Sequence, residues 1–105
     1  MLFRSLLLDE PSAFLDLKHQ VQVFALLRRL NRERGLTIVA ALHDLNLAAL
    51  FFPRLIMLRE GAIYSDGSPS EVLTEKTIDD VYGIRVRIES NPENGMPQLS
   101  ICPSL

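Results

Sequence analysis

The chain has 105 residues, of which 48% are hydrophobic and 23% charged, a composition typical of one small globular domain. Its net charge of −2 argues against direct binding to nucleic acid or anionic lipid, and its single cysteine, Cys102, excludes an intrachain disulfide and suits a reducing cytoplasm. No uninterrupted apolar stretch approaches the ~20 residues that a membrane helix requires, which argues against direct membrane insertion.

The first third of the sequence predicts a strand followed by a helix. The apolar run Leu6–Leu8 ends in acids, without the cleavage site of a signal peptide, and is typical of a parallel strand buried on both faces. Asp16 is a candidate N-cap for a helix of about residues 17–34 that ends at Gly35. The apolar residues of this helix recur at helical spacing: Val23, Leu26, Leu27 and Leu30.

A second strand and a second helix follow. Leu36–Leu42 is apolar and β-branched, so strand, helix and strand form one βαβ unit with paired parallel strands. The helix Leu45–Phe52 begins after a candidate cap at Asp44 and ends at Pro53. Because it is apolar nearly all round, we expect it to be deeply covered.

The remainder predicts small α and β elements. Strands at 54–59 and 62–65 flank the tight turn Glu60-Gly61, and a capping box at Ser68–Glu71 opens a short helix. A helix at 75–82 ends at Gly83. Strands at 85–89 and 98–101 then flank a turn-rich loop, which predicts a terminal hairpin.

Two adjacent acids, Asp9 and Glu10, follow the first predicted strand, and Asp16 lies a few residues beyond them. The chain turns at the carboxyl end of a parallel strand, so both acids can approach one ligand. The first can orient a hard cation through its waters, and the second can polarise a water that attacks a phosphate. Taken alone, such a pair more often only ends a strand in a solvated loop.

A lone histidine, His43, ends the second predicted strand. At that position it can donate a hydrogen bond to a phosphate oxygen. By itself it is more often a loop histidine beside a capping residue, here Asp44. The combination of His43 with the acids is what favours a phosphate site.

Together these segments resemble the ATP-binding subunits of ABC transporters. The Walker B strand, D-loop and switch-histidine segment of that family are matched by Leu6–Pro11, Ser12–Asp16 and Leu42–Leu45. The resemblance continues to about Ile88 through Ile56–Gly61, Gly67–Thr74 and Val81–Ile84. Three segments are most similar to importers of iron-siderophore, heme and cobalamin: Asp16–Gln20, His43–Ala49 and Val81–Gly83.

The resemblance implies a role for each candidate residue. Asp9 would orient Mg²⁺ through water, Glu10 would be the catalytic base, and His43 would contact the γ-phosphate. Asp16 would meet the opposite subunit across a nucleotide-sandwich dimer, although Ala13 and Phe14 depart from the commonest D-loop. The complete protein would use ATP and Mg²⁺. It would pair with a second ATPase subunit and with transmembrane permease subunits, at the cytoplasmic face of the cell membrane.

The sequence contains no G-x-x-x-x-G-K-[ST] loop and no Leu-Ser-Gly-Gly-Gln signature. We therefore expect one incomplete ABC ATPase domain over 1–105. Its fold would be an α/β, partial P-loop NTPase core with parallel strands, lacking the phosphate-loop strand, in residues 1–60. Small C-terminal α+β elements would occupy 61–105. Such a chain would result from a truncated gene, from a protein cut to this segment, or from a misplaced start codon.

Three functional interpretations remain open. The first is a fragment of an importer ATPase that couples ATP hydrolysis to substrate uptake and is inactive alone. The second is a non-catalytic dimerisation or regulatory module with the same fold. The third is an unrelated α/β domain in which Asp9, Glu10 and Asp16 bind Mg²⁺, which would need a lysine or a further acid at another strand end. Structurally, we expect Glu10 and His43 at one sheet edge, and a gap, a substitute pairing or another chain in place of the missing strand.

Overall fold

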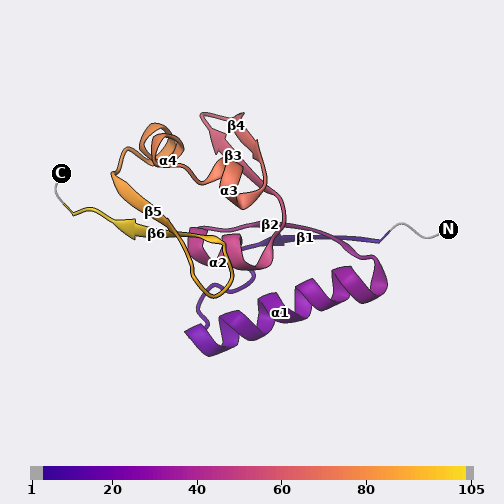
Figure 1. Cartoon of the computed structure of the whole chain (residues 1–105). Coiled ribbons are helices and arrows are strands. Elements are labelled where there is room, and N and C mark those ends of the chain that lie inside the picture. Colours follow the sequence, from indigo (N-terminus) through magenta and orange to yellow (C-terminus); the bar gives the residue numbers. More distant parts are fainter. Residues whose placement is uncertain (1–3, 104–105) are drawn as a thin grey trace. The chain divides into compact units, whose positions relative to one another are not determined.

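The computed structural model describes residues 4–103 (Figure 1). The chain divides into two compact units between Leu47 and Ala48. The division falls within helix α2, Leu45–Phe51. Among the described residues, no helix combines the length and apolar character needed to cross a membrane.

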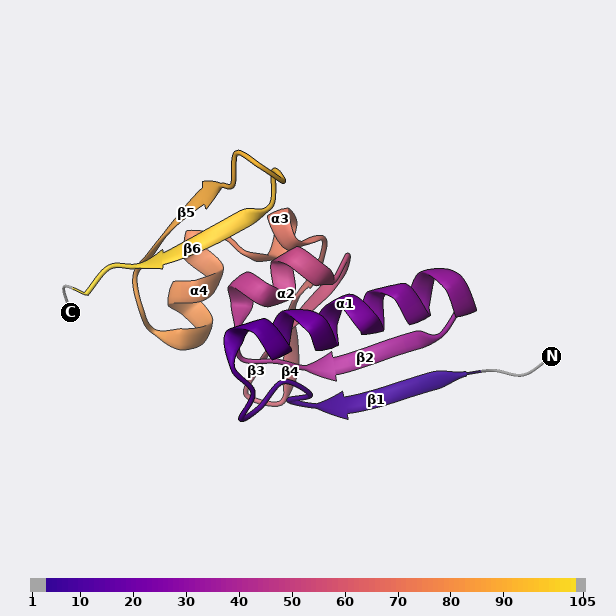
Figure 2. The same ribbon diagram turned by 90° about the horizontal axis from the view of Figure 1, so that it is seen from below.

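The first unit is the predicted βαβ arrangement. Strand β1 (Ser5–Asp9) and strand β2 (Thr37–Ala41) pair in parallel, in register from Ser5 opposite Thr37 to Asp9 opposite Ala41. Helix α1 (Leu17–Arg34) connects the strands and packs against β2. Figure 2 shows the two strands pointing the same way with α1 alongside them. The parallel pairing predicted from the two apolar runs is confirmed.

The ends of α1 are set by its capping residues. The Asp16 carboxylate accepts a hydrogen bond from the backbone N–H of His19 at 2.9 Å, satisfying one of the free donors of the first turn. At the other end Gly35 adopts a left-handed φ of 62° and donates its N–H to Asn31. The predicted helix of residues 17–34 is therefore confirmed at both ends.

The expectation that both faces of the strands are buried is wrong for this chain. Leu7 is 77% exposed and its register partner Val39 is 58% exposed. The residues immediately before and after each of them in its strand are half-buried. The reason is that α1 packs on one face of the pair, and alternate strand residues point to opposite faces. The expectation for α2 is met in part, because Ala49 is buried while Leu50 is 40% exposed.

The second unit begins with an antiparallel hairpin of β3 (Leu55–Arg59) and β4 (Ala62–Gly67). Glu60 and Gly61 both have positive φ, 52° and 78°, as a two-residue turn of type I′ requires. The register shifts after Met57, so the hairpin contains a bulge. The sequence-based prediction of this hairpin is confirmed.

Two short helices follow the hairpin. Helix α3 (Pro69–Val72) has the predicted capping box, and α4 (Glu75–Tyr82) ends at Gly83 in the left-handed conformation. α3 packs against β3 and β4, and α4 against β3 and β5. The most deeply buried side chains of this unit come from or adjoin the two helices: Val72, Leu73 and Ile78.

The chain then forms the predicted terminal hairpin. β5 (Val86–Ser90) and β6 (Pro97–Ile101) pair antiparallel, and the loop between them is closed by a 2.7 Å hydrogen bond from the Gly95 N–H to the Asn91 carbonyl. Among the described residues, β2 pairs only with β1 and β3 only with β4. The substitute pairing of the strand at Leu55–Leu58 with the strand at Thr37–Leu42 is therefore absent among the described residues.

Candidate functional site

The candidate site lies at the carboxyl ends of β1 and β2. The ladder between the strands extends one residue beyond β1, because the Glu10 N–H donates to the Ala41 carbonyl at 2.9 Å. Glu10 and His43 therefore follow strands that end at the same sheet edge. This edge is where α/β sheets commonly bind ligands.

Glu10 occupies a strained position. Its backbone φ is 50°, in the left-handed region that costs a residue with a side chain about 1–2 kcal/mol. The strand-to-loop turn that follows is fixed by a hydrogen bond from the Ala13 N–H to the Glu10 carbonyl at 3.0 Å. Strain of this kind persists where the surrounding structure enforces it, and it is frequent at functional sites.

The Glu10 carboxylate lies beside His43. His43 Nε2 is 3.3 Å from Glu10 Oε1, and the side chains are 90% and 27% exposed, respectively. Glu10 Oε1 is itself buried and has no hydrogen-bond partner among the described residues, although His43 Nε2 lies 3.3 Å away. A buried carboxylate oxygen without a donor is the arrangement expected of a group that meets a water or a ligand.

Asp9 is placed differently from Glu10. It is the last residue of β1, is exposed, and lies opposite Ala41 in the register. Mg²⁺ commonly binds one or two carboxylates and completes its shell with waters and substrate phosphates. Asp9 fits the outer part of such a shell. In the part of the chain that the structure describes, no three His, Cys, Asp or Glu side chains converge to hold a metal by themselves.

Asp16 serves the local structure of the loop and helix. Besides capping α1, its Oδ1 lies 2.6 Å from His19 Nδ1. His19 is exposed on the first turn of α1, so this contact lies at the surface of the helix. Asp16 is not brought to the edge shared by Glu10 and His43: it is exposed at the start of α1.

The loop between β1 and α1 has a contact that sequence reasoning missed. Ser12 is buried, and the Gln20 side-chain amide donates to its carbonyl at 3.4 Å, which ties the loop to the first turns of α1. The signal in the sequence was a glutamine four residues after the capping Asp16. Phe14 has a left-handed φ of 65° and a fully exposed side chain.

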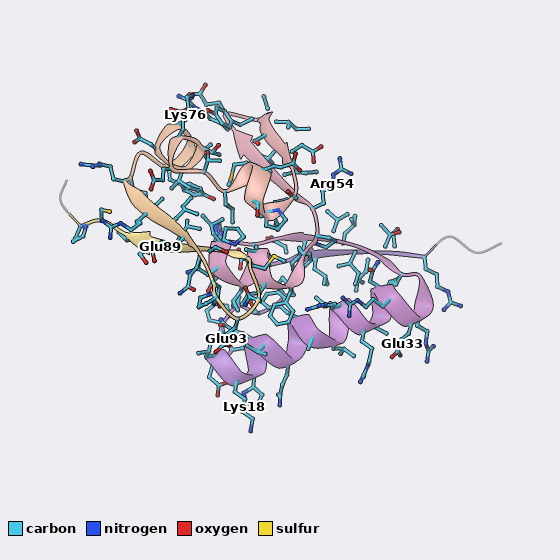
Figure 3. The ribbon with its side chains drawn as sticks, viewed as in Figure 1. Lys18, Glu33, Arg54, Lys76, Glu89 and Glu93 are labelled. Carbon is cyan, nitrogen blue, oxygen red and sulfur yellow. The ribbon has the colours of Figure 1, made fainter. Side chains whose placement is uncertain are left out.

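The second unit carries a polar cluster with a structural role. The Tyr64 hydroxyl and Lys76 Nζ both donate to Asp80 Oδ2, which links β4 to α4, and these hydrogen bonds lower the pKa of Asp80 from its ordinary value. Arg54 forms a two-pronged pair with Asp66, and its hydrogen bonds lower the pKa of that carboxyl. Figure 3 shows Arg54 and Lys76 on the surface of this unit.

Comparisons with known proteins found relatives of this chain. No protein-family model matches the chain. It is 47% identical over 92 residues to the ferric enterobactin transport ATP-binding protein FepC of Escherichia coli (strain K12), covering 88% of this chain and 34% of FepC. It is 47% identical over 88 residues to the petrobactin import ATP-binding protein FpuC of Bacillus anthracis, covering 84% and 32%.

The fold has a solved counterpart. A metal-chelate type ABC transporter in an inward-facing conformation matches 94% of this chain and 40% of its own with a TM-score of 0.80, at 22% sequence identity. The α/β fold is therefore shared with part of that transporter chain. The chain spans about a third of the length of the curated relatives that it matches.

Proposed function

We propose that the chain supplies the hydrolytic end of the ATPase site in an ATP-binding protein of a siderophore ABC importer. The chain is similar to about one third of the length of each of two such proteins. The observation that carries the proposal is the approach of His43 Nε2 to Glu10 Oε1 at 3.3 Å, at the carboxyl edge of the parallel strands.

Glu10 acts as the general base. Its carboxylate is partly buried and has an oxygen without a donor, so it can accept a hydrogen bond from the attacking water and then its proton. His43 is highly exposed at the same edge, where its ring N–H can reach a phosphate oxygen as negative charge develops on it. Glu10 thus acts on the attacking water, and His43 acts on the phosphate that the water attacks.

Asp9 and Asp16 have supporting roles. Asp9 would orient Mg²⁺ through water, and the bound ion would supply charge neutralisation of the phosphates. Asp16 caps the start of α1 and so fixes the loop that precedes this helix. In the complete protein this loop meets a second ATPase subunit. Binding of the nucleotide itself requires a phosphate cradle of backbone N–H groups and a lysine, and the sequence contains no such motif.

The complete protein would couple ATP hydrolysis to import of a ferric siderophore, working with transmembrane permease subunits at the cytoplasmic face of the membrane. The names of the two relatives support this substrate class. The same similarity argues against an unrelated magnesium-binding domain. A non-catalytic module of the same fold remains the second candidate, because this chain alone lacks a nucleotide cradle.

A hybrid protein tests the proposal. This chain would replace the matching segment of FepC, and ATP hydrolysis would be measured with the cognate permease present. Retained hydrolysis at a rate near that of FepC supports a catalytic segment. A hybrid that folds and binds ATP but does not hydrolyse it would favour the non-catalytic module.

A further inference from the structure

The net charge of −2 conceals an uneven distribution of charge. Helix α1 carries five cationic residues and one acid, Glu33, a net charge of +4 that leaves a net −6 on the rest of the chain. The cations are Lys18, Arg28, Arg29, Arg32 and Arg34. All five are exposed, and none forms an ion pair with a carboxylate within residues 4–103.

Four of these cations share one side of the helix. At about 100° per residue, Lys18, Arg28, Arg29 and Arg32 fall within an arc of about 100°. The buried residues Phe24 and Leu27 lie outside that arc. Figure 3 shows Lys18 projecting from the side of α1 that faces away from β1 and β2. We call Lys18, Arg28, Arg29 and Arg32 the basic face of α1.

The helix dipole accounts for only part of this charge. Cations in the last turn of a helix are stabilised by the partial negative charge at its carboxyl end, and Arg32 and Arg34 occupy that turn. Arg28 and Arg29 lie one turn earlier, where the effect has faded. They also stand four and three positions before Arg32, respectively, and like charges at such spacings destabilise a helix. An external anion would relieve that repulsion.

We propose that the basic face of α1 binds the surface of an anionic phospholipid membrane, a contact that goes beyond the ATPase role and does not depend on it. Clusters of four to eight Lys and Arg residues on a helix are typical of anionic-lipid contacts, and each cation strengthens partitioning about fivefold. Guanidinium groups also bind phosphate oxygens in a two-pronged geometry. The helix adsorbs without inserting, because its buried residues are already packed inside the unit.

A protein partner is less favoured by the magnitudes. Ion pairs at an exposed surface contribute little individually, and three or four of them do not offset the entropy lost when two proteins associate rigidly. A second copy could offer the exposed acids of α4, Glu75 and Asp79, but it would meet this cost. A membrane surface holds many anions at high local density and requires no fixed register.

Vesicle co-sedimentation of the full chain tests the proposal. We expect binding to vesicles of phosphatidylcholine with phosphatidylglycerol, little binding to phosphatidylcholine alone, and loss of binding at high salt. The variant R28Q/R29Q/R32Q should bind roughly 100-fold more weakly, and at least tenfold. Glutamine is a good helix former, so circular dichroism should show an unchanged helix content.

The matched control is R85Q/R87Q, which removes exposed arginines at and next to β5 and should retain most of the binding. Equal loss in both variants would mean a general charge effect and overturn the assignment to α1. Wild-type protein that ignores anionic vesicles, or that binds soluble polyglutamate in their place, would also overturn it. The polyglutamate result would indicate an acidic protein partner.

Discussion

His43 Nε2 lies 3.3 Å from Glu10 Oε1, although the two residues follow different strands and are connected by the whole of α1. The parallel pairing of β1 with β2 creates this proximity, because it carries both strand ends to the same edge. Neither strand alone would bring these two side chains together.

The chain alone should not bind Mg-ATP at micromolar concentrations. In the proposed function Glu10 and His43 act on a phosphate that other residues must hold, and the sequence contains no phosphate-binding loop. Isothermal titration calorimetry of the full chain with Mg-ATP should give no saturable heat. A micromolar dissociation constant would show that the described site holds nucleotide by itself and would contradict our account.

His43→Ala in the FepC hybrid should lower kcat by roughly 10²–10³, the usual cost of removing one donor to developing charge. His43→Gln should recover part of the loss, since the glutamine amide can donate a hydrogen bond to the same oxygen. Wild-type turnover in the alanine variant would return His43 to the role of an ordinary loop histidine. Steady-state phosphate release measures all three proteins.

Core and exposed apolar residues of the first unit should respond differently to truncation. Phe24 is 1% exposed, so Phe24→Ala should lower the free energy of unfolding by about 3–5 kcal/mol. Leu7 is 77% exposed, and Leu7→Ala should change the free energy of unfolding by no more than about 0.5 kcal/mol. Urea unfolding followed by circular dichroism measures both. A large effect of Leu7→Ala on the chain alone would mean that this strand face is covered.

Asp80 should make the second unit sensitive to acid. Hydrogen bonds from Tyr64 and Lys76 hold the pKa of Asp80 below its ordinary value of 3.8. As pH falls, the unfolded chain therefore takes up this proton first. The stabilisation is fully present above pH 3.8 and is lost as pH falls through the lower folded pKa.

The variant Asp80→Asn tests this linkage. Its Tm should lie below that of the wild type at pH 6, and the difference should shrink at pH 3, because pH 3 is below the ordinary pKa of 3.8 and the unfolded wild-type chain has begun to take up the proton. Asp79→Asn is the matched control, since Asp79 is an exposed acid of the same helix. A difference in Tm that is the same at both pH values would rule out the ionised carboxylate as its source.

Much of the fold could be predicted because its signals are local. Asp16 and Gly35 mark the ends of α1, and Ser68 with Glu71 marks the start of α3, since each cap is read from a few adjacent residues. The exposed face at Leu7 could not be predicted in this way. An apolar strand residue shows that burial is favourable in a complete sheet, but it does not show whether a covering segment is present.

The site was predictable to the same degree. The residues Asp9, Glu10, Asp16 and His43 stand out by motif, but only the fold shows that Glu10 and His43 meet while Asp16 caps a helix. The left-handed backbone of Glu10 carries no sequence signal, because glutamate rarely adopts it and the turn enforces it. The net charge of −2 did not reveal the basic face of α1, because the acids elsewhere in the chain outnumber the cations of this helix.

Single-turnover ATP hydrolysis by the FepC hybrid carrying Glu10→Gln tests whether Glu10 is the general base. The glutamine keeps the shape of the side chain but cannot take a proton, so ATP binding should persist while the rate falls by roughly 10²–10⁴. Glu33→Gln makes the same chemical change on the exposed side of α1 (Figure 3) and should leave the rate near that of the unmodified hybrid. Near-normal turnover in the Glu10→Gln hybrid would contradict the account and remove Glu10 from the role of general base.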